Sequence, residues 1–376
     1  MISVGWPGAA ADQEDLDETT ALTQAAGLTV TGQVLVTLAR PHPRTLIGSG
    51  KVAELAQQAR DGGAEVLIFG VPLSPSQERN LTTDTALPVV DRIGLIRDIF
   101  ARRARSHEGK VQVELAQLRH LQTRLVRGWT HLERQAGGIG LRGPGETQLE
   151  TDRRLVRVRI GQLERRLARI ASQRAQGRRA RTRAGVPAAA LVGYTNSGKS
   201  TLFNALTGAG TYAADQLFAT LDSTLRRVDL PGVGEVTLAD TVGFVRNLPH
   251  TLVAAFRSTL EEVREADVLV HVSDASHPGR AELAGAVNEV LEEIGAGEVP
   301  QIEVHNKIDL TGEAPRVDAG GGRCVARVWA SARTGAGLDA VREVLAAPLG
   351  RAVQRYAVQL GHCPGELRAR LYAQAH

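Results

Sequence analysis

The stretch Gly193-Tyr-Thr-Asn-Ser-Gly-Lys-Ser200 decides the fold. It matches the pattern Gly-x-x-x-x-Gly-Lys-[Ser/Thr], follows an apolar run at 188–192 and leads into a helical pattern at 201–206. This order predicts a strand, a phosphate-binding loop and a helix, because the glycines let backbone N–H groups curl around phosphate oxygens and the helix N-terminus adds positive potential. Lys199 then reaches the β- and γ-phosphates, and the Ser200 hydroxyl is a ligand for Mg²⁺.

A second motif lies after the next apolar strand pattern, at 236–238. That strand is predicted to end at Asp240-Thr-Val-Gly243, where Asp240 holds Mg²⁺ through water and the Gly243 N–H meets the γ-phosphate. Between the two motifs stands Phe218-Ala-Thr-Leu-Asp222. A Thr in a mobile loop at this place senses Mg²⁺ and the γ-phosphate. We expect Thr220 to do so, with Thr224 as the nearby alternative.

The last two motifs favour guanine as the base. A strand pattern at 302–304 ends at Asn306-Lys-Ile-Asp309. The Asp309 carboxylate accepts from both guanine N1–H and N2–H₂, a donor pair that adenine lacks, and Lys307 lies along the base plane. A further strand at 328–330 leads into Ser331-Ala-Arg333, whose backbone is expected to meet guanine O6. The ordered set therefore predicts a GTPase domain that binds GTP with Mg²⁺.

The candidate site residues divide by role. Lys199, Thr220 and Gly243 are the candidate catalytic residues, and Ser200 and Thr220 are the candidate Mg²⁺ ligands. The residues predicted to bind the nucleotide are Gly193, Tyr194, Thr195, Asn196, Ser197, Gly198, Lys199, Ser200, Phe218, Ala219, Thr220, Leu221, Asp222, Asp240, Thr241, Val242, Gly243, Asn306, Lys307, Asp309, Ser331, Ala332 and Arg333.

One expected residue is replaced. After the Asp-x-x-Gly motif, Ras-like GTPases place a Gln that orients the attacking water, whereas this chain has Phe244, which neither donates nor accepts a hydrogen bond. We therefore expect slow intrinsic hydrolysis and an outside source of catalytic assistance. Asn196 stands where potassium-dependent GTPases place a ligand for a monovalent cation. Two interpretations stay open for it: a K⁺ ligand, or a side chain that satisfies local backbone groups.

Charge is concentrated in the middle of the chain. Residues 92–183 hold 22 Arg and one Lys against eight acids, although the whole chain has a formal net charge of only +4. Apolar residues repeat with coiled-coil spacing at 111–132 and again at 156–170, separated by a glycine-dense stretch at 136–145. This pattern predicts an antiparallel two-helix hairpin, and its excess of Arg indicates RNA as a partner. The expected RNA contacts are Arg142, Arg153, Arg154, Arg157, Arg159, Arg165 and Arg166.

The domain organisation follows from these patterns, with alternating strand and helix signals before the hairpin predicting a small parallel α/β domain. The expected segments are an acidic tail at 1–26, an N-terminal α/β domain at 27–110, the basic hairpin at 111–184 with its tip at 137–145, the GTPase domain at 185–349, and a short C-terminal remnant at 350–376. With no run of about 20 apolar residues, no secretory signal and only two cysteines, we expect a cytoplasmic monomer without a membrane span.

Beyond the nucleotide motifs, the chain resembles the HflX family of ribosome-associated GTPases. The most distinctive stretch is Gly137-Gly-Ile-Gly-Leu-Arg-Gly-Pro-Gly-Glu-Thr-Gln-Leu-Glu150, and the resemblance extends over about 27–372. It implies a GTP-driven factor that binds the large ribosomal subunit, splits or rescues stalled ribosomes, and directs the glycine loop at the peptidyl-transferase region. It also implies that family members commonly carry a further small C-terminal domain, of which we expect 350–376 to be a remnant.

Two other functions are consistent with the same residues. One is a GTPase for ribosome assembly or RNA modification, which differs in its partner. The other is an RNA-binding or remodelling module in which hydrolysis is incidental, so that a Lys199→Ala variant still delivers the activity.

Overall fold

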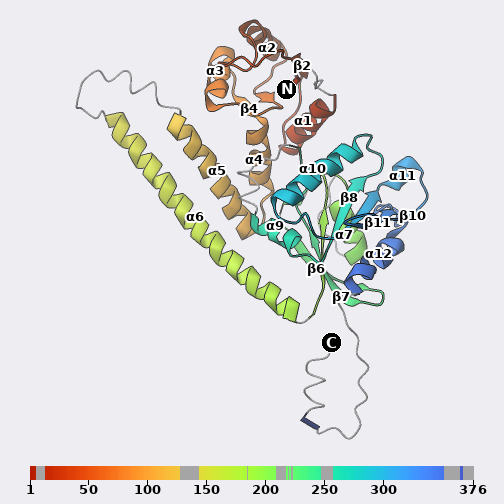
Figure 1. The fold of residues 1–376 in the computed structure, drawn as a ribbon. Coiled ribbons are helices and arrows are strands. Elements are labelled where there is room, and N and C mark those ends of the chain that lie inside the picture. The colour runs from red at the N-terminus through yellow and green to blue at the C-terminus, as the bar shows by residue number, and fades with distance from the viewer. Residues whose placement is uncertain are drawn as a thin grey trace. The chain divides into compact units, whose positions relative to one another are not determined.

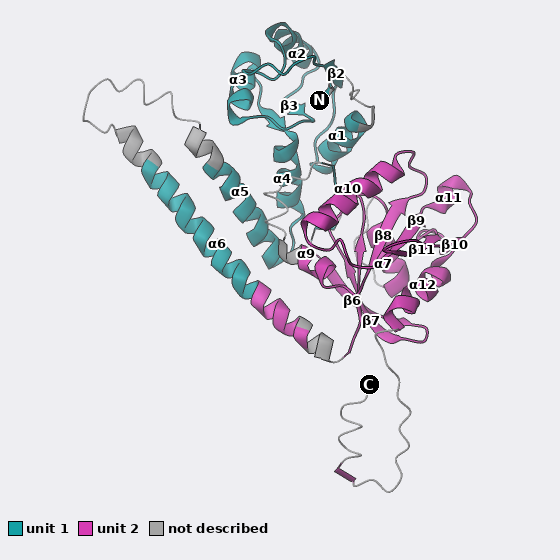
Figure 2. Cartoon of the chain, viewed as in Figure 1, with its two compact units in different colours: residues 1–170, 212–222, 245–258 teal, residues 171–211, 223–244, 259–376 magenta. Residues whose placement is uncertain are grey.

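The structure is a computed structural model in which two compact units are distinguished (Figures 1 and 2). Unit 1 comprises residues 1–170, 212–222 and 245–258, and unit 2 comprises 171–211, 223–244 and 259–376. The residues whose structure is described are 1–5, 13–127, 144–183, 185–208, 217–218, 220–221, 223–246, 257–350 and 365–366.

Unit 2 is built on a seven-stranded sheet in the order β10-β11-β9-β8-β5-β7-β6. The five central strands are parallel, whereas the edge strands β6 and β10 pair antiparallel with their neighbours. Its elements are β5 (Ala188–Val192), α7 (Lys199–Thr207), β6 (Thr224–Leu230), β7 (Gly234–Asp240), α9 (Arg257–Arg264), β8 (Val268–Asp274), α10 (Arg280–Glu293), β9 (Gln301–Asn306), α11 (Ile308–Thr311), β10 (Arg316–Ala319), β11 (Cys324–Trp329) and α12 (Leu338–Gly350).

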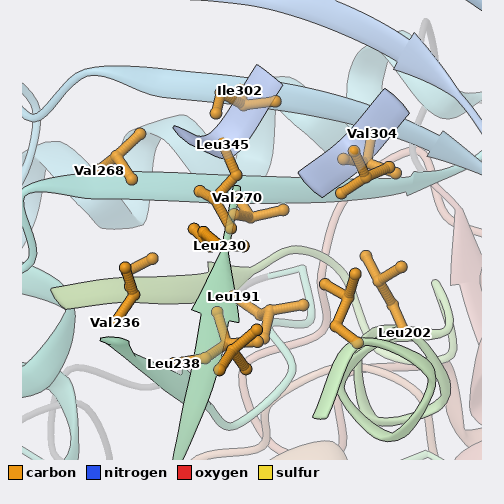
Figure 3. Packing of buried hydrophobic residues seen from close by; sticks show 14 of the residues in the cluster. Leu191, Leu202, Leu230, Val236, Leu238, Val268, Val270, Ile302, Val304 and Leu345 are labelled. Atoms are coloured by element: carbon orange, nitrogen blue, oxygen red, sulfur yellow. The ribbon is translucent and has the colours of Figure 1, made fainter. Parts of the chain in front are cut away.

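The core of unit 2 lies between this sheet and helices α7 and α12. Val270 of β8 and Ile302 of β9 are fully buried, and they share one apolar cluster with Leu202 of α7 and Leu345 of α12 (Figure 3). Central strands covered on both faces consist of continuous apolar runs, as β8 does with Val-Leu-Val at 268–270. Because the parallel strands all end at one edge of the sheet, their following loops are brought together there.

Unit 1 contains a four-stranded parallel sheet in the order β2-β1-β3-β4. Its elements before the hairpin are β1 (Ile2–Gly5), α1 (Gln13–Ala25), β2 (Val34–Thr37), α2 (Ser49–Asp61), β3 (Leu67–Phe69), α3 (Pro75–Thr85), β4 (Val89–Asp91) and α4 (Arg92–Arg103).

The prediction of an acidic tail at 1–26 is wrong. Ile2 and Val4 are buried on β1, which pairs with both β2 and β3 inside the sheet. Helix α1 buries Leu16 and Leu22. The strand has only four residues and lies before an acidic stretch, so composition concealed both the strand and a helix that buries its leucines.

Two long helices follow, α5 (His107–Arg127) and α6 (Pro144–Arg183), and they run antiparallel (Figure 1). Val111 and Leu115 of α5 share a buried cluster with Ile160 and Leu163 of α6. The apolar repeat of the second helix ends at 170 in the sequence, but the helix itself continues as far as Arg183. The glycine-rich tip at 137–145 lies almost wholly outside the described residues, as does most of 350–376. In the described part of the chain, no helix is long and apolar enough to cross a membrane.

His271 makes the free energy of unfolding depend on pH. This residue of β8 lies between Val192 of β5 and Glu303 of β9, is 4% exposed, and has a pKa lowered to about 4 because burial disfavours the imidazolium. Between pH 6.5 and 4 the unfolded chain binds a proton that the folded chain excludes. The free energy of unfolding therefore falls on acidification through this window, by up to about 3 kcal/mol from this group.

We expect His271→Gln to remove much of that loss. Denaturant titrations of the nucleotide-free protein at pH 7 and pH 4.5 measure it as the difference between variant and parent. The exposed His42→Gln is the matched control and should keep the parent's pH dependence. An unchanged pH dependence in His271→Gln contradicts the expectation.

Candidate nucleotide site

The phosphate loop connects β5 to α7 at the carboxyl edge of the sheet. Gly193 has φ +146°, and a Cβ at this position would collide with the backbone oxygen of Val272 on β8. Glycine is therefore required here both by conformation and by the close approach of a neighbouring strand. The hydroxyls of Thr195 and Ser197 are buried without a hydrogen-bond partner among the described residues, so the loop presents polar groups that phosphate oxygens can satisfy.

Lys199 spans the inside of this loop. Its Nζ donates to the carbonyl oxygen of Tyr194 at 2.7 Å, and the side chain is 6% exposed. Burial lowers the pKa of Lys199 to about 8, the Asp240 carboxylate opposes that shift, and the Lys307 cation adds to it. A buried cation of this kind is stabilised by a bound anion, which suits a phosphate chain.

Ser200 and Asp240 form the candidate metal centre. The Ser200 Oγ donates to Asp240 Oδ2 at 2.7 Å, and Asp240 ends β7 at 1% exposure. A hydroxyl and a carboxylate are the hard oxygen donors that Mg²⁺ prefers, so these residues fit the ion. Thr224, the alternative to Thr220, begins β6 and pairs in register with Asp240.

The Asp240–Gly243 motif is tied directly to the phosphate loop. The Phe244 N–H donates to the Gly193 oxygen at 3.2 Å, and the Thr195 N–H donates to the Phe244 oxygen at 2.8 Å. A Cβ on Gly243 would come within 2.8 Å of Thr195 Cγ2 and 3.0 Å of Lys199 Nζ, so this position also needs glycine. The Phe244 side chain itself is 3% exposed and packs inward.

The base-recognition loops are linked through Asn306. Its Nδ2 donates to the Ser197 oxygen at 3.0 Å, and its Oδ1 accepts from the Ala332 N–H at 2.9 Å. Asn306 therefore joins the phosphate loop to the loop after β11. The Ala332 N–H, a predicted contact of guanine O6, is already donated to this side chain.

Asp309 is exposed and lies next to the loop after β11. Its Oδ1 accepts from the Ser331 hydroxyl at 2.6 Å, which orients the carboxylate and leaves its other oxygen for a ligand. Lys307, at φ +68°, pairs through Nζ with Asp274 Oδ2 at 2.7 Å. Burial by itself would raise the pKa of Asp274, but its hydrogen bonds from Lys307 and Ser276 outweigh burial and lower it. Sequence reasoning missed Asp274, although its place at the end of β8 was a signal.

Not every predicted residue lies in unit 2. Thr220 and Leu221 belong to unit 1, and Leu221 is 3% exposed. Phe218 belongs there too and is 2% exposed, so its side chain packs in a core, and only its backbone remains available for the predicted nucleotide contact. Ala219 and Asp222 lie outside the described residues, as does Arg142.

The remaining residues predicted to bind the nucleotide lie in unit 2, in the loops that follow its strands. Thr241 donates its hydroxyl to the Leu191 oxygen at 2.5 Å, which fixes the chain between Asp240 and Gly243. Val242 is buried, Arg333 is exposed, and Asn196 is exposed with φ +62°.

Comparison with known proteins decides the family. The chain is 56% identical over 362 residues to the GTPase HflX of Escherichia coli strain K12, which covers 96% of this chain and 85% of that protein. The chain belongs to the HflX family of GTPases. It is also 48% identical to the GTPase HflX of Magnetococcus marinus, over 96% of this chain and 84% of that one.

Three family models match this HflX-family GTPase in succession. They are described as GTP-binding GTPase N-terminal at 13–101, GTP-binding GTPase middle region at 103–181, and 50S ribosome-binding GTPase at 188–307. Among solved structures, a GTP-binding protein from Sulfolobus solfataricus in complex with GDP is similar, with a TM-score of 0.47 at 24% identity over 94% of this chain and all of that one. The two HflX relatives and the family models confirm the predicted family and the predicted GTPase activity.

Proposed function

We propose that this HflX-family GTPase uses GTP to act on the large ribosomal subunit, splitting or rescuing stalled ribosomes in the cytoplasm. The observation that carries the proposal is the joining of a nucleotide site to a long arginine-rich helical hairpin in one chain. The description of the matched GTPase family model as 50S ribosome-binding supports the same partner.

We assign the nucleotide chemistry to unit 2 and the Mg²⁺ ligands to Ser200 and Thr220, with Asp240 acting through water. Bound Mg²⁺ would neutralise charge on the β- and γ-phosphate oxygens. Lys199 adds a second positive charge from the other side of the loop. Asp309 selects guanine, and Gly243 supplies an N–H to the γ-phosphate.

The hairpin carries arginines of two kinds. Arg159 pairs with Glu114 at 2.7 Å and Arg119 pairs with Glu164 at 2.8 Å, so these cations are partly neutralised between the helices. In contrast, exposed Arg165 and Arg169 form no ion pair with any residue in the described ranges.

These two arginines border a hollow on α6 with a volume of about 330 Å³. It is lined by Gln162, Arg165, Arg166 and Arg169. Forked guanidinium groups around a hollow match the oxygens of a phosphate, so we place the RNA backbone there. Arg166 also contacts the His107 ring.

Phe244 explains why such a GTPase would depend on its partner. Its buried ring cannot orient a water, and among the other described residues of the Asp240–Gly243 motif no Gln takes its place. We therefore infer a slow basal rate, on the order of 10⁻³ per second to within a decade or two, and stimulation by the ribosome.

Asn196 allows a test of monovalent-cation dependence. Its exposed side chain stands on a left-handed backbone within the phosphate loop. If it ligates K⁺ next to the β- and γ-phosphates, exchanging K⁺ for Na⁺ at constant ionic strength should lower turnover severalfold. Asn196→Ala should abolish that difference while leaving GDP affinity nearly unchanged. Equal rates in both salts would assign Asn196 a purely local backbone role.

The decisive experiment for the proposed function measures GTP turnover with and without purified large subunits. We expect stimulation by mature large subunits and not by small subunits. Stimulation by assembly precursors alone would favour the ribosome-assembly alternative. A Lys199→Ala protein that still splits or rescues ribosomes would instead favour an RNA-binding module with incidental hydrolysis.

A further inference from the structure

The segment that carries Thr220 is anchored in the core of unit 1. The Phe218 ring meets the Phe100 ring of α4 edge-on, with centroids 4.6 Å apart and planes at 85°. Both rings are almost completely buried, at 2% and 1% exposure. An edge-to-face pair of this kind fixes the mutual orientation of two side chains as well as their distance.

The backbone around this contact is also constrained. Phe218 has φ +56°, a left-handed conformation that bulky residues seldom adopt and that persists only where the surroundings hold it. Three residues later Leu221 is buried at 3% exposure. Thr220 therefore lies between two buried side chains, and the direction of its own side chain is restricted.

Helix α4 holds a second segment in the same unit. Arg92, the first residue of α4, donates from Nη2 to the Arg246 backbone oxygen at 3.1 Å and pairs with Glu18 Oε1 at 2.9 Å. Arg246 in turn pairs with Asp15 of α1 at 3.7 Å. The chain that follows the Asp240–Gly243 motif and the chain that carries Thr220 are thus both attached to one helix of the N-terminal fold.

We propose that Phe100 is a positioning residue for GTP hydrolysis, which acts through the Phe218 ring to fix the segment that carries Thr220. The inference rests on the proposed role of Thr220 as a Mg²⁺ ligand. A free loop must lose conformational entropy each time Thr220 is ordered, whereas a loop anchored two residues away has already lost most of it. In this proposal the N-terminal α/β fold holds the segment that carries Thr220.

The test compares Phe100→Ala and Phe218→Ala with the parent in four measurements: kcat, KM for GTP, GDP affinity, and the dissociation rate of a non-hydrolysable GTP analogue in Mg²⁺. We expect kcat to fall about tenfold and the analogue to dissociate severalfold faster. GDP affinity should stay within twofold, because the buried Phe218 ring does not reach a ligand, Phe218→Ala keeps the backbone, and the other predicted contacts outside 218–222 lie in unit 2. Phe100→Leu, which keeps apolar bulk, should restore most of the rate.

Two controls separate positioning from general destabilisation. Phe69→Ala removes a fully buried ring from a different cluster of unit 1, and it should lower the melting temperature without changing kcat. The Phe100→Ala/Phe218→Ala double variant should be no slower than either single variant, because both remove the same ring pair. If Phe100→Ala fails to fold, Phe218→Ala, which lies outside α4, provides the same measurement.

The proposal is overturned if kcat rises or stays constant in both single variants, if their effects multiply in the double variant, or if GDP affinity falls in parallel with kcat. Thr220→Ala serves as the reference. If Thr220→Ala leaves the dissociation rate of the analogue in Mg²⁺ unchanged, Thr220 is not a Mg²⁺ ligand. The kcat values of the Phe100 and Phe218 variants then test by themselves whether the ring pair positions the segment.

Discussion

Asp309→Asn should reduce GTP affinity by about 30- to 1,000-fold. The carboxylate is exposed, held at Oδ1 by the Ser331 hydroxyl, and open to accept from guanine N1–H and N2–H₂. Replacing one oxygen by an amide removes two charge-assisted hydrogen bonds, which costs about 2–4 kcal/mol. The same change presents a donor to the base, so xanthine nucleotides should gain affinity. Fluorescent GDP and XDP analogues measure both effects in one titration format.

Ser331→Ala is the matched control for this experiment. It removes the hydroxyl that orients Asp309 but leaves the carboxylate, so GTP affinity should fall by less than about tenfold and the preference for guanine should remain. An unaltered protein that binds ATP as tightly as GTP would contradict the assignment of Asp309 as the specificity residue.

The second large effect is expected in the hairpin, for the double variant Arg165→Gln/Arg169→Gln. These two exposed cations line the hollow on α6 and form no ion pair among the described residues. Removing one arginine–phosphate pair lowers affinity about tenfold near 0.1 M salt, because the counterions of that phosphate are no longer released. Affinity for the large subunit should therefore fall by about 10²-fold, and the negative slope of log K against log salt concentration should become shallower by about 2.

Arg119→Gln/Arg159→Gln removes the same number of charges from the same hairpin. Those two side chains are paired with Glu164 and Glu114, so large-subunit affinity should change by no more than about threefold. Sedimentation at three salt concentrations distinguishes the two variants. Equal reductions in both would show that net charge, and not the hollow, determines binding.

The nucleotide motifs could be found in the sequence because each is a local pattern. A phosphate loop needs glycines at fixed spacing between a strand and a helix, and the Asp240 and Asn306 motifs each follow an apolar strand. Parallel strands bring their carboxyl ends to one edge, so the order of motifs along the chain predicts that they meet. The contacts of Ser200 with Asp240 and of Asn306 with Ser197 agree with this expectation.

The hairpin was predictable for a similar reason. Heptad spacing is a property of neighbouring turns of one helix, and an excess of Arg can be counted without knowing the fold. The sequence could not show which arginines are neutralised, because Arg159 and Glu114 are 45 residues apart and meet only when the helices pack. The same limit applied to residues 1–26, where a four-residue strand is recognisable only from its partners β2 and β3.

The sequence by itself thus determined the family of the enzyme, its nucleotide motifs and its basic hairpin, since these depend on residue types at short spacing. Only the tertiary structure decided that Phe244 is buried, that Lys307 pairs with Asp274, and that Phe218 packs on Phe100. Each of these depends on groups more than 30 residues apart in the chain. Their proximity follows from sheet order and helix packing, which fix distances that no local pattern encodes.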